Sequence, residues 1–115
     1  MLVTDASSAA ASPSGRGTVG GFELVVTDGV PRLPDGTLAG STVTLAGQVA
    51  KLVRAGLPLE RAANLATLRP AEFFGLPGRG ILRVGGPADL VVLGPDLMVE
   101  RILEDGLDVL ARRVL

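Results

Sequence analysis

The stretch that most constrains the fold of this chain is residues 80–93, near its C-terminus. Glycines and Pro87 interrupt the first part of the stretch, where they turn the chain. An apolar run, Leu90–Leu93, follows between Asp89 and the Gly94-Pro95 pair. A short apolar run between turn signals predicts a buried strand. We therefore expect a strand at 90–93, a second at 97–103, and a turn at 104–106.

Two amphipathic helices are predicted in the middle of the chain. Ser41 is a suitable cap for the start of the first helix, and Gly56 lies where its C-terminal cap belongs. Pro58 suits the first turn of the second helix, which Pro70 should end, with a short helical turn over residues 71–74. The apolar residues at helical spacing are Leu45, Val49, Leu52 and Val53, then Leu59, Ala62, Ala63 and Ala66.

The N-terminal third predicts a strand, a loop and a hairpin. Residues 2–4 are apolar and end at Asp5, which favours a buried strand. Residues 6–21 are small and glycine-rich, so we expect a loop. Alternating apolar residues over 22–26 predict a strand. The Asp28-Gly29 pair should then turn the chain into a short returning strand at 30–33.

Composition narrows the class of protein and its partners. The 115 residues suffice for one domain, and 47% are hydrophobic, but only three are aromatic, so Leu, Val and Ala must build the core. The net charge of −1 is spread along the chain, which argues against a nucleic-acid partner. No apolar run approaches about 20 residues, so we expect no membrane partner. Without a signal peptide or any cysteine, a cytoplasmic protein is predicted.

Metal-ligating residue types are scarce. Histidine and cysteine are absent, and the carboxylates are scattered along the sequence. Zinc sites use three or four histidine, cysteine or carboxylate ligands. We therefore expect no metal ion to bind to this chain alone.

Two segments are candidates for a functional site, and each has a plainer structural interpretation. Asp5 follows an apolar run, where it is either a turn residue or a catalytic group at the C-terminal end of a barrel strand. Residues 35–41 read Asp-Gly-Thr-Leu-Ala-Gly-Ser, which is either a turn leading into a helix cap or a place where Gly40 lets a ligand approach the backbone. The residues alone leave both choices open.

Four segments in this order resemble the C-terminal part of N-acetylglucosamine-6-phosphate deacetylases, members of the metal-dependent amidohydrolase superfamily. The resemblance covers nearly the whole chain and corresponds to about the final third of a full-length member. The segment at 80–93 is common to many amidohydrolases, whereas the first two segments at their separation are more specific to the deacetylases. The four segments are residues 2–6, 35–41, 66–71 and 80–93.

The resemblance implies an α/β fold that is a fragment of a larger (β/α)₈ barrel enzyme. Residues 1–75 would be the C-terminal part of the barrel, with Leu2–Thr4 as its last strand, the closing helices, and a hairpin insertion near 22–33. Residues 76–115 would be returning strands of the small β-sandwich domain. The chain departs from the family where Thr18-Val19 replace an aromatic residue that often precedes Gly20-Gly21.

The resemblance also implies an activity: hydrolysis of the acetamide of N-acetylglucosamine 6-phosphate to glucosamine 6-phosphate and acetate. Asp5 would be the catalytic aspartate, which takes a proton from the attacking water and gives it to the departing amine. Leu38, Ala39 and Gly40 would contact the amino-sugar phosphate, at Ala39 through the backbone. The full-length family uses a divalent metal, zinc or similar, whose ligands would lie upstream of Met1. The isolated chain is therefore expected to be an inactive, truncated or split portion.

Other interpretations remain beside this one. The chain could belong to another amidohydrolase, dihydroorotase-like or deaminase-like, although the Leu38–Ser41 segment counts against that. It could also be a non-catalytic remnant, or a partner subunit that completes the barrel of another chain. A missing upstream barrel portion is then its expected partner, and a homo-oligomer is compatible with the sequence.

Overall fold

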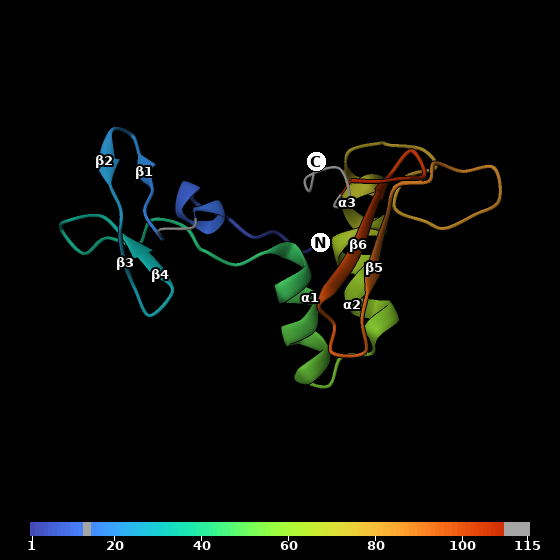
Figure 1. Ribbon diagram of the computed structural model, residues 1–115, viewed down its shortest axis with the longest axis horizontal. Coiled ribbons are helices and arrows are strands. Elements are labelled where there is room, and N and C mark those ends of the chain that lie inside the picture. The colour runs from blue at the N-terminus through green and yellow to red at the C-terminus, as the bar shows by residue number, and fades with distance from the viewer. Residues whose placement is uncertain (13–14, 110–115) are drawn as a thin grey trace. The chain divides into compact units, whose positions relative to one another are not determined.

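The computed structural model describes residues 1–12 and 15–109, which fall into two compact units. Val3–Gln48 form the first, here called the N-terminal unit. The second, the C-terminal unit, comprises Met1–Leu2 and the chain from Val49 onward. Helix α1 (Leu45–Arg54) begins in one unit and ends in the other (Figure 1).

The N-terminal unit holds two short antiparallel hairpins (Figure 1). The predicted hairpin at 22–33 is confirmed in its second half, where Asp28 and Gly29 both have positive φ, at 52° and 76°, as a two-residue hairpin turn requires. The predicted strand at 22–26 is divided at Leu24, because residues 22–23 pair with residues 18–19, whereas residues 25–27 pair with residues 30–32. The strands are β1 (Thr18–Val19), β2 (Phe22–Glu23), β3 (Val25–Thr27) and β4 (Val30–Arg32).

The predicted loop at 6–21 is more structured than its composition suggests. It contains the 3-10 helix η1 (Ser8–Ala11) as well as β1. The Ser8 hydroxyl donates to the carbonyl oxygen of Thr18 and accepts from its N–H, each at 2.8 Å. A Cβ on Gly17 would lie 2.5 Å from the Ala9 nitrogen, so only glycine permits this close packing. Local composition could not reveal the contact, because it joins residues ten positions apart.

The predicted buried strand at residues 2–4 is wrong. The structure assigns these residues to no strand, and Val3 is 64% exposed. A strand needs a ladder of backbone hydrogen bonds with a neighbour. Residues 2–4 have no such ladder in the described part of the chain, and the parallel bridge nearby joins Ala6 to Ser41.

Helix α1 ends as predicted but starts differently. The N–H groups of Gly56 and Leu57 donate to the carbonyls of Val53 and Leu52, at 2.9 and 3.0 Å, and Gly56 has φ of +99°. These two bonds form the Schellman motif that the glycine predicts. The predicted cap Ser41 is wrong, since Thr44 Oγ1 accepts from the N–H of Gly47 at 3.1 Å, one turn into the helix.

The second predicted helix is divided into two shorter helices. Helix α2 (Leu59–Ala66) ends before Thr67, whose φ and ψ of −125° and −78° are not helical. Helix α3 (Leu68–Phe73) then contains Pro70 in its first turn, so the prediction that Pro70 ends a helix is wrong. A first-turn N–H has no partner inside its helix, so proline costs no hydrogen bond there. None of the helices in residues 1–12 and 15–109 combines the length and apolar character needed to cross a membrane.

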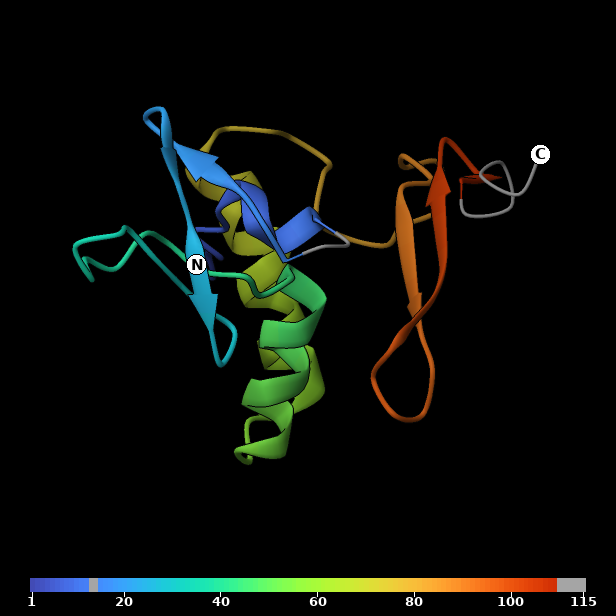
Figure 2. The ribbon, with the colours of Figure 1, turned by 60° about the vertical axis from the view of Figure 1, so that its left-hand side comes forward.

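The last third folds into a three-stranded antiparallel sheet, drawn in orange and red in Figure 2. Strand β5 (Leu90–Leu93) has the predicted bounds, β6 (Val99–Glu104) starts two residues later than predicted, and β7 (Leu107–Asp108) was not predicted. The expectation that β5 is buried is wrong, since Val91 is 57% exposed. One sheet of three strands buries an apolar face only when another layer covers it.

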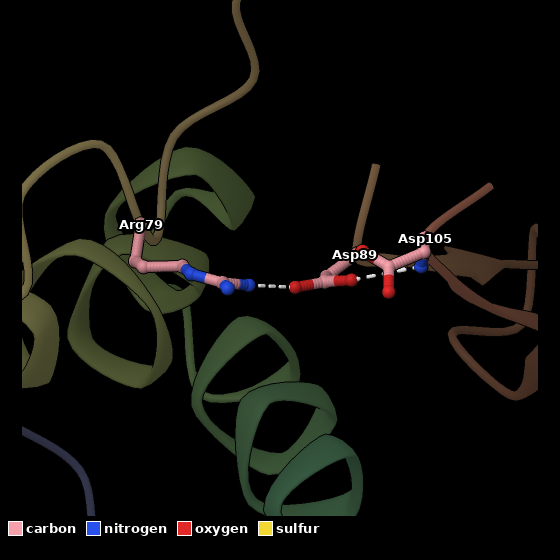
Figure 3. A network of polar contacts seen from close by, with 3 residues as sticks. All are labelled: Arg79, Asp89 and Asp105. Atoms are coloured by element: carbon pink, nitrogen blue, oxygen red, sulfur yellow. Dashed lines mark hydrogen bonds and ion pairs between the residues drawn. The ribbon is translucent and has the colours of Figure 1, made fainter. Parts of the chain in front are cut away.

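Asp89 ties the start of β5 to the turn between β6 and β7 (Figure 3). One carboxylate oxygen pairs with the guanidinium of Arg79, in the segment that follows α3. The other accepts from the N–H of Asp105 at 3.0 Å. Both side chains of the ion pair are well exposed, so it contributes at most about 1 kcal/mol.

Candidate functional site

The predicted catalytic residue and the predicted sugar-binding segment lie side by side in the N-terminal unit. Ala6 and Ser41 form a parallel bridge. In it the N–H of Ser41 donates to the carbonyl of Asp5, and the N–H of Ser7 donates to the carbonyl of Ser41, each at 2.8 Å. Asp5 is therefore a direct backbone neighbour of Gly40 and Ser41.

Gly40 is the point of closest approach between the two segments. Its φ is +81°, which L-residues with a side chain rarely adopt. A Cβ at this position would lie 2.6 Å from the carbonyl oxygen of Asp5, a separation that real Cβ atoms essentially never show. The sequence suggested that Gly40 makes room for a ligand. In the structure, the atom that needs the room is the backbone oxygen of Asp5.

Asp5 itself has an unusual backbone conformation. Its φ is +49°, in the left-handed region that few residues other than glycine adopt, although aspartate is among the more tolerant. Hydrogen bonds hold the chain on both sides of it: the carbonyl of Thr4 accepts from the Ser41 hydroxyl at 2.6 Å, and the N–H of Ala6 donates to Thr4 Oγ1 at 3.3 Å. The residue is exposed, so its carboxylate is accessible to solvent.

Leu38 and Ala39 lie against the edge of β4. Leu38 forms an antiparallel bridge with Arg32, and its side chain is 61% exposed. The N–H of Ala39 donates to the carbonyl of Pro31 at 2.9 Å. This N–H is consequently not available to a ligand, whereas the Leu38 side chain is accessible.

A tight turn precedes the Leu38–Gly40 segment. The N–H of Thr37 donates to Asp35 Oδ1 at 2.9 Å, and the N–H of Gly36 donates to the carbonyl of Leu33 at 2.8 Å. The hydrogen bond from the Thr37 backbone lowers the pKa of Asp35, because it stabilises the ionised carboxylate. The turn that the sequence indicated at the start of residues 35–41 is therefore formed, and Asp35 closes it.

Ser41 is the residue of this site that sequence reasoning assigned to another role. Its hydroxyl is bonded to Thr4 and so does not cap α1. The hydroxyl and its acceptor are 37 residues apart, and no local pattern in the sequence indicates the bond. Thr4, expected only as a strand residue, likewise proves to hold the backbone beside Asp5.

Metal-ligating side chains are not clustered in the part of the chain that the structure describes. Within residues 1–12 and 15–109, no three Asp, Glu, His or Cys side chains are grouped closely enough to hold an ion. The full sequence has no histidine or cysteine to add. Among the described residues, the neighbours of Asp5 include the backbone of Gly40 and Ser41.

Residues 20–109 match the Amidohydrolase family, which is more than half of the chain. The chain belongs to that family. Amidohydrolases are generally metal-dependent enzymes.

Several relatives of this amidohydrolase chain are named as amino-sugar-phosphate deacetylases. It is 38% identical over 108 residues to the putative N-acetylgalactosamine-6-phosphate deacetylase of Escherichia coli strain K12, covering 92% of this chain and 65% of that protein. It is 36% identical over 102 residues to the N-acetylglucosamine-6-phosphate deacetylase of Vibrio furnissii, covering 87% of this chain and 26% of that protein.

A solved structure of a deacetylase has a region with the same fold as this chain. The N-acetylglucosamine-6-phosphate deacetylase of Thermotoga maritima superposes with a TM-score of 0.81 and 40% sequence identity, over 95% of this chain and 30% of that one. The mixed arrangement of strands and a few helices therefore matches a region of that enzyme. This amidohydrolase chain spans less than two thirds of each of these three relatives.

Proposed function

We propose that this chain supplies the catalytic carboxylate and part of the sugar-binding surface of an N-acetylglucosamine-6-phosphate deacetylase. One observation carries the proposal: Asp5 and the Leu38–Gly40 segment, which resemble the deacetylases and lie far apart in sequence, are backbone neighbours. The metal-binding and phosphate-binding residues would come from outside these 115 residues. The complete enzyme would be cytoplasmic.

In this proposal, Asp5 transfers one proton in two steps. Its carboxylate accepts a proton from water as the water oxygen bonds to the acetamide carbonyl carbon. The carboxyl group then gives the proton to the amide nitrogen as the carbon–nitrogen bond breaks, which releases acetate and glucosamine 6-phosphate. Positioned carboxylates of this kind typically accelerate reactions about 10²- to 10⁴-fold.

The Leu38–Gly40 segment would contact the sugar in a restricted way. The N–H of Ala39 is bonded to Pro31 and is not free for the sugar, so contact would come from the accessible side chain of Leu38 and from the other backbone groups of the segment. Carbonyl oxygens accept hydrogen bonds from sugar hydroxyls, and Leu38 would cover an apolar face of the ring.

The proposed fold extends the match to the Thermotoga enzyme. Residues 1–75 would complete the C-terminal part of a (β/α)₈ barrel, and residues 76–115 would return to a small β-sandwich. The exposed apolar side chains of β5 would then be covered by sandwich strands from outside this chain. A relative named for N-acetylgalactosamine 6-phosphate makes that sugar the second substrate to assay.

A hybrid enzyme tests the proposal. In it, this chain replaces the matching 30% of the Thermotoga maritima deacetylase, and acetate release is measured with both N-acetylhexosamine 6-phosphates. We expect activity with N-acetylglucosamine 6-phosphate, and a loss of at least about 10²-fold in turnover for Asp5→Asn with KM nearly unchanged. Hydrolysis of dihydroorotate instead would favour the other amidohydrolase interpretation.

Asp28→Asn is the matched control. Asp28 is also exposed, belongs to the same unit and has φ of 52°, close to the 49° of Asp5, but it lies in the turn between β3 and β4. The control should keep the activity of the unsubstituted hybrid. Equal losses in the two variants, or turnover retained by Asp5→Asn, would show that Asp5 has no chemical role.

A further inference from the structure

Ser41 makes more hydrogen bonds to the chain around Asp5 than its place in a helix cap would suggest. Its hydroxyl donates to the carbonyl of Thr4 at 2.6 Å, and its N–H donates to the carbonyl of Asp5 at 2.8 Å. Its own carbonyl accepts from the N–H of Ser7 at 2.8 Å and from the Ser7 hydroxyl at 3.1 Å. The polar groups of this one residue thus bond to the backbone before, at and after Asp5.

We propose that Ser41 is a positioning residue that holds Asp5 in its left-handed backbone conformation. The inference rests on the proposed function, because it concerns the geometry of the carboxylate that transfers the proton. A left-handed aspartate persists only where the surrounding structure determines it. The bonds from Ser41 to Thr4, Asp5 and Ser7 provide that constraint.

The side chain of Ser41 matters because its backbone bonds do not reach Thr4. The hydroxyl fixes the peptide that precedes Asp5, whereas the N–H and carbonyl of Ser41 fix the peptides that follow it. Both hydroxyl partners are partly buried, so water competes less well for the Thr4 carbonyl than it would at the surface. Without the hydroxyl, Ser41 holds only the peptides that follow Asp5. The φ of Asp5 can then relax.

Thr42 offers a matched control one residue away. Its hydroxyl donates to the carbonyl of Gly29 at 2.5 Å, in the turn between β3 and β4, and so does not touch the chain around Asp5. Ser41→Ala and Thr42→Ala each remove one hydroxyl that is bonded to a distant carbonyl of the same unit. Ser41→Thr keeps a hydroxyl at position 41.

The experiment measures kcat and KM for the three variants in the hybrid enzyme, with N-acetylglucosamine 6-phosphate as substrate. We expect Ser41→Ala to lower kcat by about 10- to 100-fold with KM within about twofold, because small displacements of a catalytic group cost rate rather than binding. Ser41→Thr should recover most of kcat, and Thr42→Ala should match the unsubstituted hybrid.

A second measurement uses the hybrid enzyme and does not depend on activity. Amide hydrogen exchange at Ser7 and at position 41 should speed up by about 2- to 10-fold in Ser41→Ala, the scale of one lost hydrogen bond, but not in Thr42→Ala. Equal effects of the two alanine variants on kcat or on exchange would overturn the inference, as would failure of Ser41→Thr to recover kcat. An inactive unsubstituted hybrid would instead refute the proposed function.

Discussion

Gly40→Ala is the substitution for which the structure predicts the most specific outcome. The sequence suggested that a side chain at this position would block the approach of a ligand. The structure predicts a different fault, because the new Cβ would lie 2.6 Å from the carbonyl oxygen of Asp5 and must push it away. Displacing this oxygen disturbs the bond that the Ser41 N–H makes to it. We therefore expect a fall in kcat together with a loss of stability.

The size of the effect has two parts. An alanine with φ near +81° costs about 1–2 kcal/mol from its left-handed conformation alone. Overpacking by one methyl group against fixed backbone adds about 1–3 kcal/mol. Gly40→Ala should thus destabilise the N-terminal unit by about 2–5 kcal/mol, and the second part is the one that depends on the contact with Asp5.

Gly36→Ala measures the cost of the left-handed conformation by itself. Gly36 lies in the same unit with φ of +89°, but no atom lies within 4 Å of the place where its Cβ would be. It should cost about 1–2 kcal/mol and leave kcat unchanged. Thermal melts of the hybrid enzyme, followed by circular dichroism, should put Gly40→Ala below Gly36→Ala by at least about 2 °C.

The comparison can fail in a definite way. If the two variants melt together and turn over substrate equally, the close approach of Gly40 to Asp5 does not exist in solution. A rise in KM for Gly40→Ala, with kcat and melting equal to those of Gly36→Ala, would restore the interpretation that Gly40 makes room for the sugar.

Two further predictions concern pH and association. Because the pKa of Asp35 is lowered from 3.8, its hydrogen bond with Thr37 stabilises the fold above that pH and is lost as the pH falls through the lowered value. The urea midpoint of Asp35→Ala should therefore lie below that of the unsubstituted hybrid at about pH 6, and the gap should shrink at about pH 3; an equal gap at both would contradict the assignment. The 115-residue chain alone should bind a hydrophobic dye and self-associate, since Phe73, Leu82 and Val84 are 72%, 83% and 106% exposed. A monodisperse monomer with a cooperative melt would show that these surfaces need no cover.

Local signals predicted local structure well. Gly56 marked the end of α1, Asp28-Gly29 marked a hairpin turn, and the apolar run Leu90–Leu93 marked β5 with its observed bounds. The apolar run of β5 is itself local, although the strand pairs with β6 further along the chain. For the first two signals, the hydrogen bonds that they imply join residues close in sequence. Turn and cap preferences act over that distance, so the sequence alone is sufficient.

Signals failed where a residue had two possible partners. Ser41 has the side chain of a helix cap, but its hydroxyl bonds to Thr4, and Thr44 caps α1 instead. Pro70 was expected to end a helix, yet it lies in the first turn of α3. The preceding helix already ends before Thr67, whose backbone is not helical. Burial was also overestimated for β5, since an apolar run does not reveal which layer covers it.

The sequence was sufficient to identify the residues of the candidate site. Only the tertiary structure shows that Asp5 and the Leu38–Gly40 segment are neighbours. The order of segments marked Asp5 and Leu38–Gly40 through their resemblance to the deacetylases. The bridge between Ala6 and Ser41 joins residues far apart in the chain, so its formation depends on the entropy of closing that loop and on everything packed within it. That pairing, together with the positive φ of Gly40, explains why glycine occupies position 40.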